Sequence, residues 1–232
     1  MKKLYSILII SLLFLSVGLS QQEYNSKDLI KMENGLYTIK FSDEPISGKV
    51  YGYFGEESSP KRVYVGNMVN GKKEGNWKSY YHSTGKKIYD YNYKNGKLDG
   101  LNTDWYENGK KRGEGTYKGD KEDGLITSWY ENGQKNFRGT YKDGKPDGLV
   151  TKWYENGQKE EEGTWKDGIE DGLFTEWYEN GQKSFEGTYK DGKSDGLGTE
   201  WYENGQKMYE GTIKDDKLIS KKEWNEDGSM KE

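Results

Sequence analysis

The side chains that most often carry catalysis are scarce in this chain, which has one histidine and no cysteine. His82 lies beside Ser83 and Thr84, so its imidazole could act as a base next to a hydroxyl nucleophile. The alternative, which we favour, is an exposed polar residue in a turn. Composition alone excludes a thiol nucleophile and a histidine-based zinc site.

Carboxylates are plentiful, and a pair of them flanking a glycosidic bond is the catalytic set of a glycosidase. The glutamates recur once per repeat, beside a turn, as Glu107, Glu131, Glu155, Glu179 and Glu203. An active site requires a unique concave pocket, which a feature repeated along the chain does not supply. We therefore predict no catalytic residues and expect that the protein is not an enzyme.

Paired aspartates in Asp-Gly-Lys-Xaa-Asp-Gly segments superficially resemble calcium loops. Asp143 with Asp147 and Asp191 with Asp195 are two such pairs. A calcium loop of the EF-hand type needs more alternating oxygen ligands and a terminal bidentate glutamate. Asp and Gly are also the residues that tight turns prefer. We predict turns here, without a metal site or a cofactor.

Aromatic side chains recur at a spacing that could stack sugar rings along a glycan. The alternative is that the rings pack on neighbouring Leu and Thr side chains and stabilise the fold. The residues spaced 24 apart are Trp105, Trp129, Trp153, Trp177 and Trp201. We name these five as candidate binding residues, together with Phe137, Phe185 and Tyr209.

Two neighbouring positions differ from repeat to repeat. The first position holds Arg112, Asn136, Glu160, Ser184 and Met208, and the second holds Gly113, Phe137, Glu161, Phe185 and Tyr209. Different side chains at a fixed geometry would give a repeat protein an individual binding face.

The same 24-residue spacing predicts the fold. Each unit reads W-Y-E-N-G-K/Q-K, then G-T-Y/W/I-K, then D-G-L. In one unit, residues 125–131 and 135–142 are rich in β-branched and aromatic residues, and Asn-Gly and Asp-Gly follow them as hairpin signals. The pattern predicts an all-β protein: an elongated, twisted antiparallel sheet of tandem hairpins in which sequential strands are neighbours.

A two-residue type I′ turn at Asn132-Gly133 predicts the register of each hairpin, with Tyr130 opposite Lys135 and Ser128 opposite Phe137. The residues expected on one face are Tyr130, Phe137, Gly139 and Tyr141, and those on the other are Leu125, Thr127, Trp129 and Thr140. A bulged turn would exchange the faces. We expect an aromatic ring to lie across the glycine that recurs in every unit.

The units become irregular toward both ends, as capping repeats do. We divide the chain into a signal peptide (residues 1–20), an N-terminal cap with a degenerate repeat (21–65), regular hairpin repeats (66–217) and a C-terminal capping half-repeat (218–232). The segment S-Y-Y-H-S-T-G at residues 79–85 matches the turn of a unit with one residue inserted.

Residues 1–20 have the pattern of a secretory signal peptide. Lys2 and Lys3 precede an apolar run, and small residues precede the predicted cleavage site after Ser20. The run of about 16 residues is shorter than the roughly 20 that span a membrane, which disfavours the alternative of a retained anchor. We expect export to the periplasm, the cell surface or the medium, with no stable membrane insertion after cleavage.

Charge and composition restrict the partners. Cleavage removes Lys2 and Lys3 and lowers the net charge from −4 to −6, with acidic and basic residues interspersed along the chain. A mildly acidic surface argues against nucleic acid as a partner. With 31% hydrophobic but 15% aromatic residues, the chain suits a thin sheet better than a thick core, and no disulfide can stabilise it.

The segments W-Y-E-N-G-Q-K, E-G-T-Y-K-D-G-K and D-G resemble the MORN-repeat variant family of bacterial proteins. The resemblance covers about residues 66–217 and is strongest from Asp99 on. It implies an extended antiparallel β-sheet. Some members are labelled antitoxin or immunity components of toxin–antitoxin modules, so the resemblance also implies a protein partner, with neutralisation of a toxin as one role.

Repetition without a catalytic set predicts an exported scaffold that binds another protein through a β-sheet surface, an antitoxin or immunity-type protein by resemblance. The alternative is a cell-envelope or extracellular glycan-binding protein that uses the aromatic rows. The sequence identifies neither the partner nor the face of the sheet that binds it.

Overall fold

The computed structural model describes residues 22–55 and 59–231, so the predicted signal peptide at residues 1–20 lies outside the described residues. The N-terminal elements are β1 (Glu23–Asn25), the short 3-10 helix η1 (Ser26–Asp28), β2 (Leu29–Lys31), β3 (Tyr37–Ile39), β4 (Gly48–Phe54), β5 (Lys61–Val69), β6 (Lys72–Tyr80) and β7 (Lys87–Lys94). The regular units contain β8 (Lys97–Trp105), β9 (Lys111–Lys118), β10 (Lys121–Trp129), β11 (Lys135–Lys142), β12 (Lys145–Trp153), β13 (Lys159–Lys166), β14 (Ile169–Trp177), β15 (Lys183–Lys190), β16 (Lys193–Ser194), β17 (Gly196–Trp201), β18 (Lys207–Lys214) and β19 (Lys217–Glu223).

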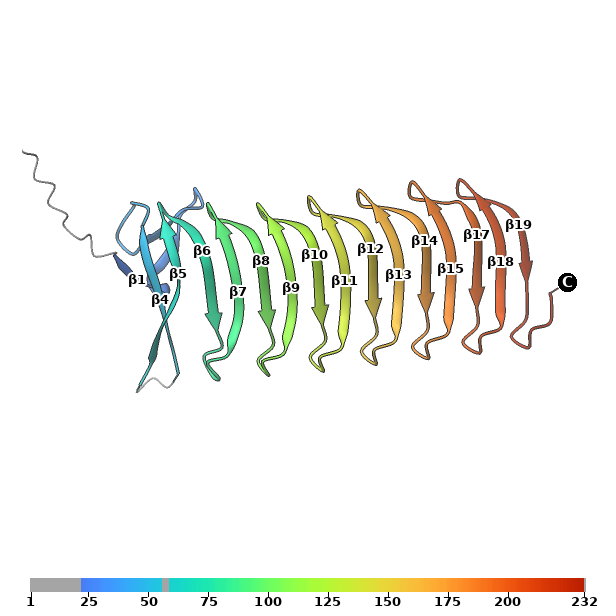
Figure 1. Ribbon diagram of the computed structural model, residues 1–232, viewed down its shortest axis with the longest axis horizontal. Helices are drawn as coiled ribbons and strands as arrows, with labels where there is room; N and C mark the ends of the chain where they lie inside the picture. The colour runs from blue at the N-terminus through green and yellow to red at the C-terminus, as the bar shows by residue number, and fades with distance from the viewer. Residues whose placement is uncertain (1–21, 56–58, 232) are drawn as a thin grey trace, which may run out of the picture.

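These strands form a long meander, which confirms the predicted fold class. Seventeen of them make one sheet, and β2 pairs with β3 separately. From β4 to β19, strands that are consecutive in the sequence lie side by side and run antiparallel, with β16 and β17 both paired to β15. Figure 1 shows the strands in one row from β4 to β19.

The Asn-Gly loops differ from the predicted turn. The Tyr130 N–H donates to the Gln134 carbonyl at 2.8 Å, and the Gly133 N–H donates to the Tyr130 carbonyl at 2.9 Å. Gly133 has a φ of 96°, whereas Asn132 is not among the residues with positive φ. The loop therefore has three residues and ends in a left-handed glycine, the other hairpin geometry that Asn-Gly fits. The predicted pairing of Tyr130 with Lys135 is wrong, because Trp129 takes that place.

A bulge in each hairpin compensates for the longer loop. The register shifts between Ser128 and Trp129, and Ser128 lies opposite Phe137 as predicted. The predicted assignment of the strand residues to the two faces is therefore confirmed, whereas Tyr130 lies in the loop. The inserted residue in the loop after β6 is confirmed too, since Tyr81 bonds to Lys86, one position further on than in the regular units.

The Asp-Gly turns adopt the geometry that was expected of the Asn-Gly turns. Asp143 has a φ of 50° and Gly144 a φ of 82°, and the flanking Lys142 and Lys145 pair directly. Two central residues with positive φ define the type I′ turn, whose twist matches that of the strands. The equivalent aspartates at positions 167, 191 and 215 also have positive φ.

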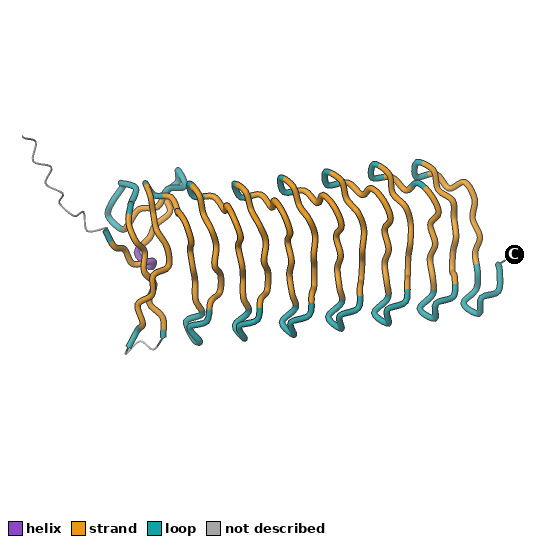
Figure 2. The backbone as a smooth tube through the Cα atoms, viewed as in Figure 1, coloured by secondary structure: helices purple, strands orange, loops and turns teal. Residues whose placement is uncertain are grey.

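Side chains of the Asn-Gly loops link each repeat to the next. The Tyr130 hydroxyl donates to the Trp153 carbonyl at 2.7 Å, and Asn132 Nδ2 donates to the Glu155 carbonyl at 2.9 Å. The same pair of bonds recurs along the sheet, starting from Tyr106, Tyr154, Tyr178 and Tyr202 and from Asn108, Asn156, Asn180 and Asn204. These loops stack along one rim of the sheet in Figure 2. The Tyr-Glu-Asn-Gly segment, which recurs in every regular unit, thus serves the stacking of the repeats.

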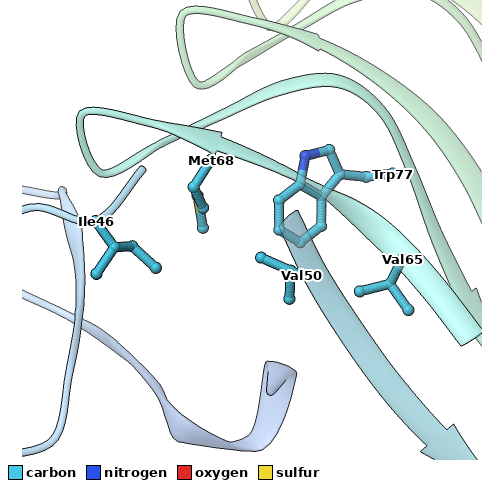
Figure 3. Packing of buried hydrophobic residues seen from close by; sticks show 5 residues of the cluster. All are labelled: Ile46, Val50, Val65, Met68 and Trp77. Atoms are coloured by element: carbon cyan, nitrogen blue, oxygen red, sulfur yellow. The ribbon is translucent and has the colours of Figure 1, made fainter. Parts of the chain in front are cut away.

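The N-terminal end contains the principal hydrophobic cluster of the described residues. Its members are Ile46, Val50, Val65, Met68 and Trp77 (Figure 3). β1 pairs with β4 in parallel, and side chains from β2 and β3 pack against the cluster. Among the described residues outside this cluster, Val150 is the only buried hydrophobic side chain. Most of the sheet is therefore one layer thick, with both faces accessible.

Candidate interaction surfaces of the sheet

The two faces of the sheet present different residues, which alternate along each strand. We call one the glycine face, because it contains the recurring glycines, with Ile126, Ser128 and Tyr141 as further members in one unit. We call the other the tryptophan face. Its members in the same unit include Leu125, Thr127 and Trp129.

A single row on the glycine face crosses the sheet from strand to strand. We call it the variable row, because its residue types differ along the sheet. In order, its directly paired members are Asp104, Gly113, Ser128, Phe137, Lys152, Glu161, Glu176, Phe185, Glu200 and Tyr209. The row contains two kinds of position in alternation: the residue that precedes each tryptophan and the second variable position of each repeat.

The bulge brings the first variable position to the same face. In a bulge, two residues of one strand lie opposite a single residue of the other. Accordingly, the Arg112 guanidinium lies 3.3 Å from Asp104 Oδ1, and the Ser128 hydroxyl donates to Asn136 Oδ1 at 3.5 Å. Both variable positions of the repeat therefore contribute to the glycine face.

Acidic side chains in the variable row are only partly neutralised. Lys152 Nζ lies 2.8 Å from Glu161 Oε2, but Glu161 also lies directly opposite Glu176. Glu176 is exposed, but partial desolvation raises its pKa above the ordinary value, and the neighbouring Glu161, Glu160 and Glu200 raise it further. Within the described residues, neither Glu176 nor Glu200 forms an ion pair. This part of the glycine face is thus locally acidic.

Aromatic rings pack beside these carboxylates. The Phe174 ring lies 5.8 Å from Trp165, 5.9 Å from Tyr189 and 6.4 Å from Phe185, measured between centroids. These distances suit edge-to-face aromatic contacts. The rings are half-buried, so they stabilise the sheet and still present surface to solvent.

The recurring glycines lie beneath these side chains, as predicted. A Cβ atom on Gly163 would lie 2.4 Å from Phe174 Cδ2 and 2.9 Å from the Trp165 ring. A Cβ atom on Gly187 would lie 2.6 Å from the Phe185 ring. The rings therefore rest on bare backbone, which is why a side chain is absent at this position.

The tryptophan face has alternating indole rings and lysines. Trp129 lies opposite Lys135, whose Nζ is 5.6 Å from the centre of the Trp153 ring. The same cation–π arrangement joins Lys159 to Trp177 and Lys183 to Trp201, at 5.3 and 5.8 Å. Each of these rings therefore already contacts a lysine of the same protein.

Most lysines in this row also neutralise a carboxylate. Lys159 lies 2.7 Å from Glu162, and Lys111 lies 2.5 Å from Glu114. The tryptophan face also has a row of roughly half-exposed leucines at positions 101, 125, 149, 173 and 197. Its composition hardly changes from repeat to repeat, in contrast to that of the glycine face.

The structure divides the predicted binding residues between the two faces. The five tryptophans lie on the tryptophan face, and Phe137, Phe185 and Tyr209 lie on the glycine face, so they do not form one site. The prediction omitted Glu176 and Glu200. Variation at the position before each tryptophan was the signal that could have revealed them.

The residues considered for catalysis and metal binding lie in exposed loops. His82 and the glutamates at positions 107, 131, 155, 179 and 203 are exposed, and Ser83 hydrogen-bonds Glu107. His82 also lines a hollow of about 690 Å³, together with Phe54 and Tyr80. In the described part of the chain, no group of three His, Cys, Asp or Glu side chains is placed to hold a metal ion. Nor does that part contain a helix of the length and apolarity that crossing a membrane requires.

Comparison with protein families agrees with this geometry. The MORN repeat variant model matches residues 98–118, 122–143, 146–167 and 170–191, and the MORN repeat model matches residues 64–76 and 185–207. Each match to the variant model covers one hairpin, that is, two strands and the Asn-Gly loop between them. A search of curated proteins finds no match to this chain. With its matched repeats spread over most of its hairpins, this chain belongs to the MORN-repeat family.

Proposed function

We propose that this protein is an exported, non-enzymatic repeat scaffold that binds another protein through its glycine face. The observation that supports this proposal is the variable row. The backbone, loops and tryptophan face are nearly constant between repeats, whereas the residues of the variable row differ. A constant framework with varied side chains on one face is how repeat proteins obtain individual binding surfaces.

Charge distinguishes the two faces as binding surfaces. On the tryptophan face, carboxylates such as Glu162 and Glu186 are paired with lysines of the same strand. On the glycine face, Glu161 opposes Glu176, an arrangement that costs stability in a sheet. A partner with basic side chains would relieve this repulsion. We infer that the partner presents a basic surface to this region.

Export is supported by the signal-peptide pattern at residues 1–20, and the family resemblance adds the specific role of an antitoxin or immunity protein. In that role the partner would be a toxin, and the acidic part of the glycine face would contact it.

The experiment compares three versions of the mature protein as bait in an envelope extract, with the partner identified by mass spectrometry. The glycine-face variant combines Glu176→Ser with Phe185→Glu, residues that other repeats hold at the same positions, so the fold should persist. The control is Leu173→Thr on the tryptophan face, where Leu173 is 55% exposed. We expect the wild type and the control to retain one partner that the glycine-face variant loses.

Capture that depends on Leu173 and not on the variable row would contradict the proposal, as would the absence of any retained protein at several salt concentrations. Glycan binding is tested separately by titrating Trp fluorescence with cell-wall and exopolysaccharide fragments. We expect no response. A response that Trp153→Leu removes would instead support the aromatic row as a glycan site.

A further inference from the structure

One repeat breaks the charge pattern of the tryptophan face. In β9, β11, β13, β15 and β18 the residue before the recurring glycine is charged, and it is a glutamate in every one of these strands except β11, which has Arg138. Each of those glutamates forms an ion pair with the lysine three residues before it; the pairs are Lys111 with Glu114, Lys159 with Glu162, Lys183 with Glu186 and Lys207 with Glu210. In β11 the lysine is Lys135, and a second cation takes the place of the carboxylate.

The two cations of β11 have no carboxylate partner. Neither Lys135 nor Arg138 forms an ion pair with another described residue. Across the sheet, one threonine separates Arg138 from Glu114 on one side and from Glu162 on the other. Both glutamates are already paired with lysines of their own strands, and Glu162 also accepts the Thr151 hydroxyl at 3.1 Å. The positive charge of this repeat is therefore left for another anion.

Arg138 lines a hollow of about 340 Å³ on the tryptophan face, which we call the Arg138 hollow. It extends across β10 to β13, which lie side by side in the middle of the sheet (Figure 1). Its other lining residues are Leu125, Leu149, Trp153, Thr140, Thr151 and Glu162. The two leucines are 44% and 54% exposed, so the hollow is open to solvent. Lys135 Nζ lies 5.6 Å from the centre of the Trp153 ring, which places the second cation beside the same space.

The chemistry of the Arg138 hollow suits a carboxylate that carries an apolar group. A guanidinium binds a carboxylate through two parallel N–H···O bonds. In the neighbouring repeat the lysine equivalent to Lys135 holds a carboxylate at 2.7 Å, so Lys135 is placed to reach the same kind of group. Leu125, Leu149 and Trp153 supply apolar surface beside the cations.

Other ligand classes fit this lining less well. A cationic ligand would be repelled by Arg138 and Lys135. Inorganic phosphate would pair with both cations but leave the apolar surfaces uncovered. The volume lies near the lower limit for small-molecule sites, which occupy about 300–1,000 Å³, so the apolar group is no larger than one side chain.

We propose that the Arg138 hollow binds a carboxylate with a small apolar group, either as a free acid or as the C-terminal residue of another protein. The carboxylate accepts hydrogen bonds from the Arg138 guanidinium and the Lys135 ammonium group, and the apolar group contacts Leu125, Leu149 and Trp153. The hollow lies on the face opposite the variable row, so this inference does not rest on the proposed function.

The test uses isovalerate as a probe and follows the indole N–H signals of the mature, full-length chain labelled with ¹⁵N, at low ionic strength. The Trp153 signal is assigned from its loss in Trp153→Phe. Trp177 and Trp201 are internal controls, because they occupy the same place in repeats that have a glutamate instead of Arg138. We expect millimolar isovalerate to shift the Trp153 signal alone. The absence of a shift would overturn the site, and so would an equal shift of all three signals.

Three further probes define the ligand. Isovaleramide has the same shape as isovalerate without the charge, and inorganic phosphate has the charge without the apolar group, so we expect neither to shift Trp153. A shift with isovaleramide equal to that with isovalerate would overturn the role of the carboxylate, and a shift with phosphate equal to that with isovalerate would overturn the role of the apolar group. N-acetyl-leucine distinguishes the two sources. Tighter binding of N-acetyl-leucine than of isovalerate assigns the site to a C-terminal residue, and weaker binding assigns it to a free acid.

Arg138→Glu restores the residue that the other repeats have, so the fold should persist. We expect it to weaken isovalerate binding by about tenfold or more, because it removes a charge-assisted hydrogen bond. The matched control is Arg112→Glu, which makes the same change of charge on the glycine face and copies Glu160 at the equivalent position. It should leave isovalerate binding unchanged. Equal weakening by both variants would mean that net charge and not the hollow attracts the probe, which would contradict the inference.

The repetition of the chain also permits the converse experiment. Two repeats further on, the lining of the Arg138 hollow recurs with identical residues, except that Glu186 replaces Arg138; the counterparts are Leu173, Thr188, Leu197, Thr199, Trp201 and Glu210, with Lys183 in place of Lys135. Glu186→Arg should therefore create a second site. We expect isovalerate to shift the Trp201 signal in this variant as well as the Trp153 signal. A Trp201 signal that still does not respond would overturn the assignment of the site to the arginine and its lysine neighbour.

Discussion

At the scale of single residues, stability depends on what lies above the bare backbone of the glycine face. Phe174 and Trp165 cover Gly163 so closely that no side chain fits. At a different glycine on the same face, Gly198, an added Cβ atom would make only ordinary contacts, with Ile213 at 3.7 Å as the nearest side chain. The two glycines therefore have different physical reasons for their presence.

Alanine substitution distinguishes these two cases. Gly163→Ala should destabilise the protein by about 1–3 kcal/mol, because the added methyl group forces two rings to move. Gly198→Ala should be neutral or stabilising by up to about 1 kcal/mol, since it restricts the unfolded chain and meets no obstacle. Urea denaturation followed by Trp fluorescence measures both. Equal destabilisation by the two substitutions would show that the rings do not rest on Gly163.

Glu176 gives stability a defined dependence on pH. Its pKa in the folded protein is raised above the ordinary 4.5, first by partial desolvation and then by neighbouring glutamates. The folded state therefore holds this proton more tightly than the unfolded state, and stability falls as pH rises from about 4.5 through the folded pKa. We expect Glu176→Gln to raise the melting temperature at pH 7 and to leave it nearly unchanged at pH 4.

Glu210 is the control for this prediction, because the sign is reversed. A hydrogen bond from Lys207 lowers the pKa of Glu210, so its contribution is present at neutral pH and is lost on acidification. Glu210→Gln should lower the melting temperature at pH 7 or leave it unchanged. If Glu176→Gln lowers the melting temperature at pH 7, as Glu210→Gln is expected to do, the repulsion assigned to Glu176 is absent.

At the scale of hairpins, the two kinds of turn make different demands on their residues. Asp143 occupies a left-handed conformation, with a φ of 50°, whereas Asn132 does not. Asn132 is needed for its side chain instead, which bonds to the next loop. At one end of each hairpin Asp is needed for the backbone conformation of the turn, and at the other end Asn is needed for the bond between loops.

Substitution by a β-branched residue tests the Asp-Gly turn. Asp143→Val should destabilise the protein by roughly 1–2 kcal/mol, the cost of placing such a residue in the left-handed region. Asp147→Val is the control, because Asp147 lies in β12 and is not among the residues with positive φ. Thermal denaturation measures both. A loss at Asp147 equal to that at Asp143 would exclude backbone conformation as the cause.

The sequence predicted the strands and their order but not the closure of the Asn-Gly loops. The order of the strands follows from the 24-residue period of the sequence. The alternation of side chains between the two faces follows from the two-residue period of a strand. Loop closure depends on whether one or two residues take positive φ, and Asn-Gly is compatible with both. The predicted face assignment survived because the bulge at Ser128 and Trp129 restored the register.

The candidate site was predicted only in part, for a similar reason. Phe137 and Phe185 were identified because they vary between repeats. Glu176 and Glu200 were not, since their importance depends on neighbours in adjacent strands. Glu161 opposes Glu176, and Phe185 opposes Glu200, only in the observed register.

At the scale of the whole molecule, each repeat contacts mainly the repeats before and after it. A sheet that is one layer thick has no shared core to disrupt, so its stability is close to a sum over neighbouring units. The N-terminal end differs, because the cluster around Val50 and Met68 draws on several elements at once.

Removal of one complete unit should therefore shorten the protein without unfolding it. Deletion of residues 146–169 removes two strands and rejoins equivalent positions, so the maximum dimension in small-angle X-ray scattering should fall by about 10 Å. The control is deletion of residues 146–157, which brings together two strands that run in the same direction. A two-residue turn cannot join such strands, so this variant should lose more of its β-sheet circular dichroism than the first variant does. Unfolding of the first variant would contradict the additive description.

The bonds between loops have a further consequence for how the chain finds its structure. Tyr130 donates to Trp153, but every following unit offers the same tyrosine, tryptophan and asparagine in the same places. A hairpin that docks one whole unit out of step, or onto a second molecule, still makes these bonds. Refolding at high protein concentration should consequently produce slipped forms and forms in which hairpins are exchanged between molecules. Asn102, Phe174 and Gly198 occupy the same position in different repeats, and such differing residues are what distinguish the correct alignment.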